Sequence, residues 1–495
     1  DRGRLGLLII HQKIKNKMDL FKKSLHITSG VVLFSGLLLA CKVQQPALPA
    51  VSLPTAFRNS DSLAINDTSK SIGTISYKDF FTDATLLGLL DKAMLHNNDL
   101  NVAVKQIQIA SLGFEQSRWA FLPKVSATIG STTITRPSDN SMNGLMAGQF
   151  LGQKYIGDYN SLFNISWEAD IWGKMKGQKE AALSEYLKTQ EAAKAVRTRI
   201  VVEVVQGYYN LLMLDKQIEI SNRNLLFADS TLTFLKKQFE LGLINSLAVQ
   251  QQEVTIDQIS KSIPSIESAI TLQENALSVL IGEMPDKISR TVLLNDIIIS
   301  ENLATGVPAQ LLANRPDIKV SELDFRKAAA SVHVAKVSMY PALNITAQTG
   351  LNAFKSSDWF KLPGSLFGII AGSITQPVFQ GKQLKVQYQQ SKIMLEQSEI
   401  QFKQMILKAV SEVSDALVQI EKLKQQEIIA QSQVQKSDDL VNKALTLYKL
   451  NEATYLDVIV AQSNRLQYEL DLASIKNQHL TAITMLYRSL GGGQN

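Results

Sequence analysis

Cysteine is almost absent from this chain of 495 residues, because Cys41 is the only one. No disulfide bond can therefore form within one copy of the chain. Histidine is also scarce, and the five histidines are His11, His26, His96, His333 and His479. They lie far apart along the sequence, so the sequence gives little support for a histidine-based metal centre or catalytic triad. We expect no metal and no other cofactor.

Blocks of one charge sign are also missing. The 51 Lys and Arg residues nearly balance the 45 Asp and Glu residues, which leaves a formal net charge of +6 on a long chain. Basic residues cluster only within the first twenty-three positions. A nucleic-acid partner is therefore not expected. Hydrophobic residues make up 45% of the chain, which is enough to bury a core.

Residues 18–40 have the order of a secretory signal peptide. Lys22 and Lys23 form a basic start, Val31–Leu39 is an apolar core, and small residues precede Cys41. A membrane-spanning helix needs about 20 apolar residues, so this core is too short to serve as an anchor. We expect the segment to be removed, and we interpret residues 1–17 as an upstream extension that contributes nothing to the fold.

The end of this leader, Leu38 to Cys41, resembles the lipobox of bacterial lipoproteins. The position favours lipidation of Cys41 over the alternative of a buried leader cysteine. The next residues, 42–66, are rich in Pro, Ser, Ala and Gln and show no periodicity. We interpret 41–82 as a lipidated tether with an N-terminal segment.

Proline is absent from 174–263, and both proline and glycine are absent from 382–490. Such stretches predict unusually long helices. Apolar residues recur at spacings of three and four, as at Ala409, Val413, Ala416, Ile420 and Leu423, which is typical of coiled-coil packing. Each stretch has one break, at Leu241–Asn245 and at Leu450–Thr454. The result is two antiparallel hairpins whose first arms are about 100 Å long at 1.5 Å per residue.

The hairpins are an internal duplication with a constant offset of 209 residues. Equivalent pairs are Glu203 and Glu412, Phe239 and Tyr448, and Leu247 and Leu456. The offset indicates one repeat at 83–290 and a second at 291–495.

Alternating polar and apolar residues before each long helix predict four β-strands. Pro123 precedes the strand 124–136 and Pro341 precedes 342–354, and each is followed by a loop and a second strand, at Leu162–Trp172 and at Leu366–Phe379. One apolar set comprises Val125, Ala127, Ile129, Phe163, Ile165 and Trp167. The pattern fits a membrane wall with one wet face, although a half-buried soluble sheet remains the alternative.

Aromatic residues beside the loops are typical of the girdle at a membrane interface: Phe150, Tyr155, Tyr159, Phe354, Trp359 and Phe360. Four strands cannot close a transmembrane barrel, because an open sheet edge in lipid leaves backbone groups unpaired. Three copies would supply about 12 strands, so a homotrimer is the simplest solution.

Several motifs resemble the TolC-like outer membrane efflux protein family, in particular its NodT-like lipoprotein branch that serves RND-type tripartite pumps. They are WEADIWGK at 167–174, LLANRPDI at 311–318, YPA at 340–342, FELGLINSL at 239–247 and YLDVIVAQ at 455–462. The resemblance covers nearly the whole mature chain. For RPDI a structural interpretation suffices, because Pro316 suits a first helical turn and Asp317 the helix dipole.

The resemblance implies a mainly α chain with a membrane β-barrel: a trimeric barrel of four strands per chain that continues into a long α-helical barrel. It implies an outer membrane exit duct without enzymatic activity. Drugs or other small toxic compounds would leave passively through this duct. A periplasmic adaptor and an inner-membrane RND-type transporter would be its partners. Export of heavy metals or of polypeptides by the same fold is the alternative.

Two functions of other classes remain open. A lipoprotein enzyme could use Glu168 and Asp170, which alternate on one predicted strand face, as a carboxylate pair. A structural tether between the membranes would need the helices but not the alternating strands. Ion conductance distinguishes a duct from a tether.

The resemblance places the adaptor contact at the hairpin tips, at Gly242, Leu243, Asn245, Asn451, Glu452 and Thr454. Plain turn chemistry is the alternative, since Gly and Asn supply left-handed caps at helix ends.

Just past the second tip, Asp457 would occur three times around the closed end of a trimer. Three converging carboxylates repel one another and attract cations, and Leu456 and Val460 could form the apolar part of such a gate. The equivalent position of the first repeat holds Ala248. The alternative is a helix cap, because Thr454 to Asp457 has the T-x-x-D spacing of a capping box.

Overall fold

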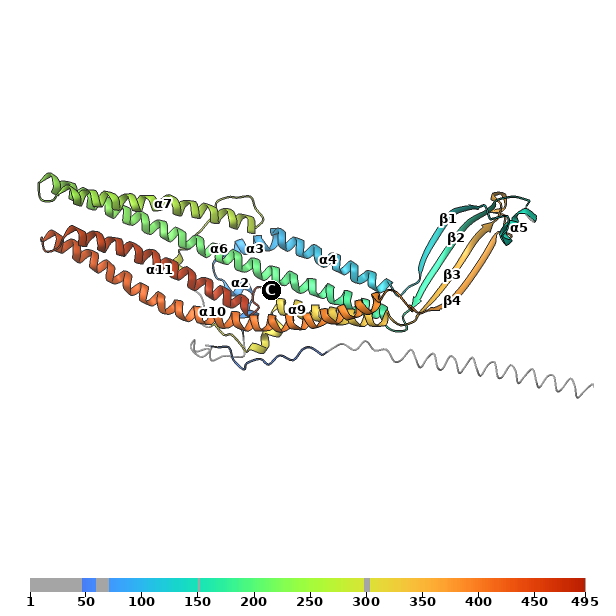
Figure 1. The fold of residues 1–495 in the computed structure, drawn as a ribbon. Helices are drawn as coiled ribbons and strands as arrows, with labels where there is room; N and C mark the ends of the chain where they lie inside the picture. The colour runs from blue at the N-terminus through green and yellow to red at the C-terminus, as the bar shows by residue number, and fades with distance from the viewer. Residues whose placement is uncertain (1–46, 59–70, 150–151, 298–302, 495) are drawn as a thin grey trace, which may run out of the picture. The chain divides into compact units, whose positions relative to one another are not determined.

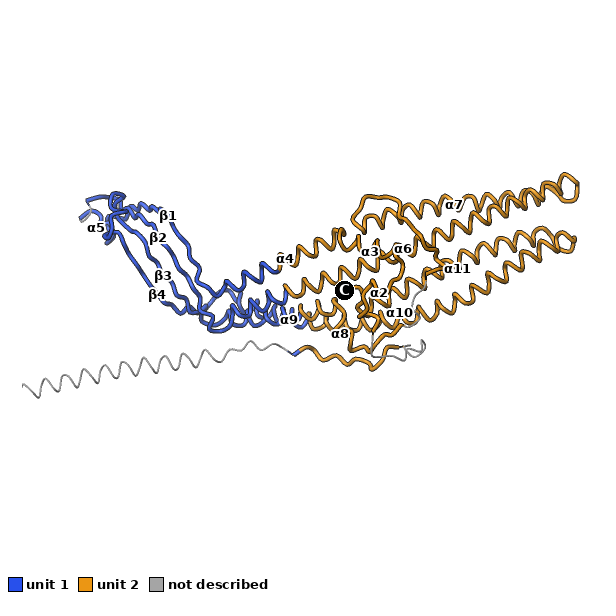
Figure 2. The backbone as a smooth tube through the Cα atoms, turned by 180° about the vertical axis from the view of Figure 1, so that it is seen from behind, with its two compact units in different colours: residues 1–47, 111–185, 325–397 blue, residues 48–110, 186–324, 398–495 orange. Residues whose placement is uncertain are grey.

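A computed structural model describes residues 47–58, 71–149, 152–297 and 303–494. The leader, Cys41 and Phe150 lie outside these residues. The described chain forms two compact units, which Figure 2 distinguishes by colour. Unit 1 comprises Ala47, 111–185 and 325–397, and unit 2 comprises 48–110, 186–324 and 398–495, apart from the undescribed positions.

The element order confirms the duplication (Figure 1). The first half contains α3 (Ala84–His96), α4 (Asn98–Trp119), β1 (Lys124–Thr135), α5 (Met142–Gln149), β2 (Ile156–Ala169), α6 (Lys174–Glu240) and α7 (Ser246–Leu280). The second half contains α8 (Leu311–Asn314), α9 (Pro316–Val337), β3 (Ala342–Ala353), β4 (Leu366–Thr375), α10 (Gln383–Lys449) and α11 (Tyr455–Ser489). The helix lengths match between the halves: α4 and α9 have 22 residues, α6 and α10 have 67, and α7 and α11 have 35.

Both predicted breaks are confirmed. Helix α6 ends at Glu240 and α7 begins at Ser246, while α10 ends at Lys449 and α11 begins at Tyr455. Helix α7 also continues through Pro264, beyond the proline-free stretch that the sequence marked. Residues after this proline, such as Leu277, are buried in the core, and that packing offsets the missing amide hydrogen bond.

The four strands form one antiparallel sheet in the order β1-β2-β3-β4. Val125 lies opposite Ile165, and Ile165 lies opposite Ala347 on β3. Directly paired residues share a face, so the predicted apolar sets of the first two strands lie on the same side of the sheet. Ser126, Asn164 and Gln348 are paired in the same way on the other side. Over β1 to β3 the sheet therefore has one apolar and one polar face, while β4 carries apolar residues such as Ile369 and Ile370 on both sides.

The predicted strand ends were partly wrong. Strand β2 begins at Ile156 and ends at Ala169, because Asp170 leaves the strand to cap α6: its side chain accepts from Met175 N at 2.8 Å and from Lys176 N at 3.0 Å. Strand β4 ends at Thr375, two residues before Pro377, which has no amide hydrogen for a ladder.

The main core lies in unit 2, where α6, α10 and α11 bury apolar side chains against α3 and the N-terminal segment. Tyr208 and Tyr487 are fully buried there, and each has a partner for its hydroxyl group. Tyr208 donates to Asp83 Oδ2 at 2.6 Å and Tyr487 donates to Ile75 O at 2.7 Å. Asp83 also caps α3 by accepting from Thr85 N at 2.7 Å. No helix among the described residues is both long and apolar enough to cross a membrane.

The RPDI segment has the predicted structural role, and the structure adds a buried ion cluster to it. Pro316 is the first residue of α9 and Asp317 lies in its first turn. Arg315, only 4% exposed, donates to Asp317 Oδ2 at 2.6 Å and to Glu412 Oε2 at 2.7 Å. In the first repeat, Arg199 lies 2.8 Å from Asp99 and 3.5 Å from Glu203, the equivalent of Glu412. The duplication thus preserves an arginine between two carboxylates while its place in the sequence differs.

Candidate functional site at the hairpin tips

Each hairpin turns through a residue in the left-handed region. Gly242 has φ of 70° and Asn451, its equivalent in the second repeat, has φ of 59°. Glycine and asparagine are the residues that tolerate this conformation best, so turn chemistry explains both identities. Asn245, by contrast, is extended and makes no capping hydrogen bond with its side chain. Leu243 and Glu452 are exposed at the tips.

Asp457 interacts with Thr454, as the T-x-x-D spacing predicted. Its Oδ2 accepts from Thr454 N at 2.8 Å and from the Thr454 hydroxyl at 2.6 Å. These hydrogen bonds, the side-chain one first, lower the pKa of Asp457 below its usual value, because both stabilise the carboxylate. The Asp457 side chain is exposed in the single chain, and its lowered pKa keeps it ionised at neutral pH. The helix-cap role is therefore confirmed.

The other predicted gate residues lie beside Asp457 on the surface. Leu456 and Val460 are four residues apart on α11, and both are about half exposed. Ala248 is partly buried against the apolar cluster behind the tips. The first tip therefore offers no carboxylate at the equivalent place.

Behind the tips a small core joins the two hairpins. It contains Leu235 from α6, Val441 and Ala444 from α10, and Tyr455, Val458 and Ala461 from α11. Three polar contacts cross between the hairpins: Tyr455 to Gln252, Tyr448 to Gln238 at 2.7 Å, and Gln462 to Thr231 at 3.4 Å. The sequence pattern did not predict these contacts. Gln252 is fully buried, and a glutamine on an otherwise apolar helix face was the signal that could have indicated it.

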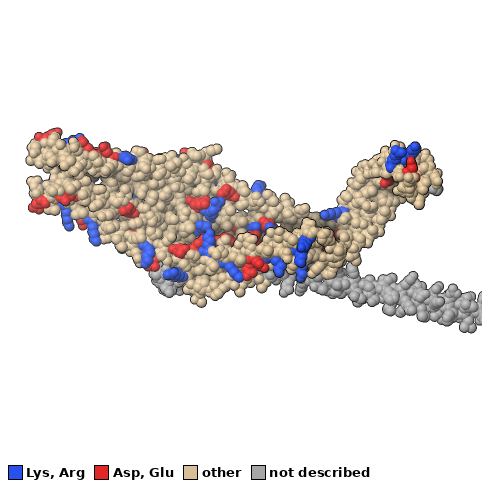
Figure 3. All heavy atoms as spheres, in the orientation of Figure 1, with Lys and Arg blue, Asp and Glu red and all other residues tan. Residues whose placement is uncertain are grey.

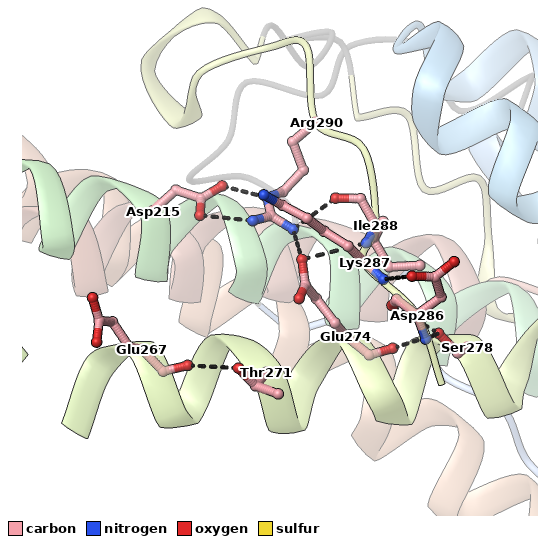
Figure 4. A network of polar contacts seen from close by, with 9 residues as sticks. All are labelled: Asp215, Glu267, Thr271, Glu274, Ser278, Asp286, Lys287, Ile288 and Arg290. Carbon is pink, nitrogen blue, oxygen red and sulfur yellow. Dashed lines mark hydrogen bonds and ion pairs between the residues drawn. The ribbon is translucent and has the colours of Figure 1, made fainter. Parts of the chain in front are cut away.

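Two buried carboxylates of the described chain, Glu274 and Glu469, are held by arginines, whereas the buried Asp83 accepts from the Tyr208 hydroxyl and a backbone amide. Figure 4 shows Arg290 between Asp215 on α6 and Glu274 on α7, with a nitrogen-to-oxygen distance of 2.5 Å to each. Burial acts to lower the pKa of Arg290, but these hydrogen bonds and charges outweigh it and raise the pKa. Carboxylates paired with a cation in this way are engaged in a structural contact and are poor general acids or bases.

The carboxylate pair considered for an enzyme is not formed. Lys174 Nζ lies 2.9 Å from Glu168 Oε1, while Asp170 caps α6 beyond the end of the strand. The expectation that both share one strand face was wrong, because β2 ends between them. Among the described residues, no three His, Cys, Asp or Glu side chains gather to hold a metal ion.

Comparison with protein families gives a match to the outer membrane efflux protein model in two stretches, residues 89–283 and 307–492. The matched stretches correspond to the two structural repeats and cover most of the chain. The chain belongs to the outer membrane efflux protein family.

Individual relatives of this efflux protein agree with that assignment. The cation efflux system protein CusC of Escherichia coli K12 is 25% identical over 459 residues, which cover 93% of this chain and 97% of CusC. The probable outer membrane lipoprotein SilC of Salmonella typhimurium is 24% identical over 475 residues, covering 96% and 99%. The open state of the Neisseria gonorrhoeae outer membrane channel MtrE superposes with a TM-score of 0.80 at 21% identity, covering 92% and 99%. The fold is that of a TolC-like channel, and the protein is an efflux channel rather than an enzyme.

Proposed function

We propose that this efflux protein is the homotrimeric outer membrane exit duct of a tripartite pump. The observation that carries the proposal is the combination of a family match over both repeats with a four-stranded sheet that has two open edges. Three sheets joined edge to edge would pair the outer strands and close a barrel of about 12 strands. The polar sheet face would line the bore, and the helical hairpins would continue it.

Passive conduction tests this function. Purified protein reconstituted into a planar bilayer should give single-channel ion currents. A bilayer without the protein is the control and should show no such currents. A structural tether would bind or span the bilayer without conductance, which would contradict the proposal.

We place the adaptor contact at the tips, at Gly242, Leu243, Asn245, Asn451, Glu452 and Thr454. A Gly242→Arg change would combine bulk with backbone strain, because Gly242 has φ of 70°. Leu243→Arg is the cleaner variant, since Leu243 is 68% exposed and its change adds charge without removing core packing. It should abolish efflux in cells while the trimer assembles normally. Unchanged efflux in both variants would exclude the tips as the contact.

We place a gate at Asp457, Leu456 and Val460. Three copies of each would meet in the trimer, where convergent carboxylates favour cations. Asp457→Asn keeps the shape of the side chain, and Asp457→Ala removes the cap as well. A gate predicts that both variants conduct more and select less for cations. A cap alone predicts unchanged conductance with a lower thermal midpoint for the alanine variant.

We further propose a lipid anchor on Cys41, supported by the lipobox-like residues before it and by the relative SilC, which is described as a probable outer membrane lipoprotein. A labelled fatty acid should enter the wild-type protein and not Cys41→Ser. The sheet would remain the main anchor, so the variant should retain some transport.

The cargo that we propose is small toxic compounds, with cations as the second candidate. The relative CusC is described as a cation efflux protein, which is the observation that favours the second. A deletion strain should distinguish them by whether it becomes sensitive to hydrophobic drugs and dyes or to copper and silver salts. Crosslinking at Leu243 would capture the adaptor, and the identity of the adaptor would indicate which pump it serves.

A further inference from the structure

A belt of cationic and bulky apolar residues flanks the sheet where its outer strands meet the helices. We define this helix-end belt as Arg118, Trp119, Leu122 and Lys124, which lead into β1, and Val378, Phe379, Lys382 and Lys385, which follow β4. Strands β1 and β4 are the two edges of the sheet. All eight residues belong to unit 1.

The apolar members of the belt are far more exposed than a folded domain requires. Val378 is 93% exposed, Phe379 86%, Trp119 63% and Leu122 51%. Trp119 ends α4, and the other three lie in the short connections between strand and helix, where the described chain leaves them uncovered. Aromatic rings at such a place are typical of the zone where hydrocarbon gives way to lipid headgroups.

The four cations of the belt have no carboxylate partner. No ion pair joins Arg118, Lys124, Lys382 or Lys385 to an acidic residue of the described chain, and the nearest acidic residue on α4 is Glu115, one turn earlier. Between β2 and α6 the charges are different. There Lys174 is paired with Glu168, and Asp170 caps the helix. Lys176 on α6 and Lys336 on α9 also form no ion pair among the described residues, so unneutralised positive charge is concentrated at the edges of the sheet without being confined to them.

Between the two ends the sheet is nearly free of charge. Lys124, Asp158 and Glu168 are the only charged strand residues, and Asp158 lies at the loop end. In Figure 3 the Lys and Arg atoms of the sheet gather at its two ends, with uncharged surface between them. Strands of about 10 residues tilted by about 45° cross a bilayer, so the belt would lie at one headgroup layer.

We propose that the helix-end belt binds the phosphate groups of acidic glycerophospholipids in the leaflet on the helical side of the membrane. The inference rests on the proposed membrane sheet and trimer. In that trimer the β1 edge of one protomer pairs with the β4 edge of the next. The two halves of the belt then adjoin, and each of three junctions holds four unpaired cations beside exposed Trp119 and Phe379.

The chemistry favours an acidic over a zwitterionic lipid. A choline headgroup carries its own cation, which compensates the phosphate, whereas phosphatidylglycerol keeps a net negative charge that the four side chains can neutralise. The loop end of the sheet is closer to charge balance, with four cations and three carboxylates. Its cations Arg136, Lys154, Lys355 and Lys361 are accompanied by Asp139, Asp158 and Asp358. Lys361 is itself paired with Asp358 at 2.8 Å.

Trp119 provides a reporter inside the belt. The trimer would be reconstituted in phosphatidylcholine vesicles that contain a fixed fraction of a brominated lipid. That lipid would be phosphatidylglycerol in one sample and phosphatidylcholine in the other. Bromine quenches nearby indoles, and the Trp119→Phe variant gives the signal of the other tryptophans. We expect the brominated acidic lipid to quench Trp119 about threefold more strongly than the neutral one, and high salt to remove the difference.

A matched pair of variants locates the effect. Lys382→Gln with Lys385→Gln should abolish the preference for acidic lipid, whereas Lys154→Gln with Lys355→Gln makes the same charge change at the loop end and should preserve it. Equal quenching by both lipids, or equal loss in both variants, would overturn the inference. Quenching by neither lipid in an inserted, conducting trimer would show that a neighbouring protomer covers the belt. Protein that enters no bilayer would contradict the proposed function itself.

Discussion

Single side chains in this protein contribute measurably to the free energy of unfolding. Arg315 is the clearest case, because it is buried and binds two carboxylates from different elements. Burial raises the pKa of Asp317, but the hydrogen bond and the charge of Arg315 outweigh it and hold that pKa below the usual value. The carboxylate of Asp317 is therefore more stable in the folded chain than in the unfolded one.

Replacing Arg315 should destabilise unit 2 strongly. Arg315→Met leaves Asp317 and Glu412 without their cation in a largely buried place. We expect a loss of about 2–3 kcal/mol, less than for a fully buried pair because Asp317 is 36% exposed. Thermal unfolding followed by helical circular dichroism measures it. Arg488→Met, an exchange at an exposed arginine of the same unit outside this cluster, is the control; an equal loss there would argue against a specific role.

The same pair predicts a dependence on pH. A depressed folded pKa adds stability above the unfolded pKa, near 3.8, and this contribution is lost as pH falls through the folded value. Wild-type protein should therefore lose stability below about pH 4 more steeply than Asp317→Asn. Parallel acid unfolding curves for the two proteins would contradict the assignment.

Gly492 should not accept a side chain. A Cβ at this position would lie 2.5 Å from Cζ of Tyr487, whose ring is fully buried and whose hydroxyl accepts from Gly493 N at 2.9 Å. Gly492→Ala should cost about 1–3 kcal/mol through overpacking. Gly88→Ala is the matched control, because nothing lies within 4 Å of its Cβ and alanine favours a helix. A loss in both variants would sink the steric explanation.

At the scale of elements, the two hairpins are joined near their tips by buried polar contacts rather than by apolar packing alone. Gln252 on α7 donates through Nε2 to Ala228 O at 2.7 Å and accepts from the Tyr455 hydroxyl on α11. A fully buried amide with both ends satisfied specifies how the helices align, since any slip would leave it unpaired.

Removing the Tyr455 hydroxyl tests this alignment. Tyr455→Phe leaves Gln252 Oε1 buried without a donor, and we expect a loss of about 1–3 kcal/mol. Tyr455→Phe combined with Gln252→Leu should recover much of it, because both polar partners are then absent. Thermal unfolding of the single and double variants measures the coupling, and additive losses would show that the two side chains do not interact.

At the scale of the whole molecule, the sheet is the part whose backbone hydrogen bonding is incomplete in a single chain. Strands β2 and β3 are paired on both sides, whereas β1 and β4 each have one free edge in the single chain. Within a hydrocarbon layer those edges must be paired, so completion requires other copies.

Crosslinking should show where completion occurs. With Cys41 replaced by serine, cysteines at Ser126 on β1 and Ser373 on β4 should crosslink between protomers through a short bifunctional reagent and yield a ladder ending at the trimer. Cysteines at Ser166 and Thr346, which are directly paired between β2 and β3, should crosslink within one chain. A monomer band alone for the edge pair would refute edge-to-edge assembly.

The sequence by itself determined the elements of this protein, because their causes are local. Proline and glycine are absent where α6 and α10 run, Gly242 and Asn451 stand at the turns, and period-two alternation marks the strands. The duplication was equally visible, since the two hairpins carry equivalent residues at a constant offset of 209.

Only the tertiary structure decided which side chains meet. Arg315 reaches Glu412, which is 97 residues away, and Gln252 meets Tyr455 across the two hairpins, 203 residues apart. The structure also shows that Asp170, which was predicted within a strand, caps α6 instead. Periodicity reports which face of an element is apolar, but a hydrogen bond depends on the distance between two elements, and that distance is set by how the whole core packs.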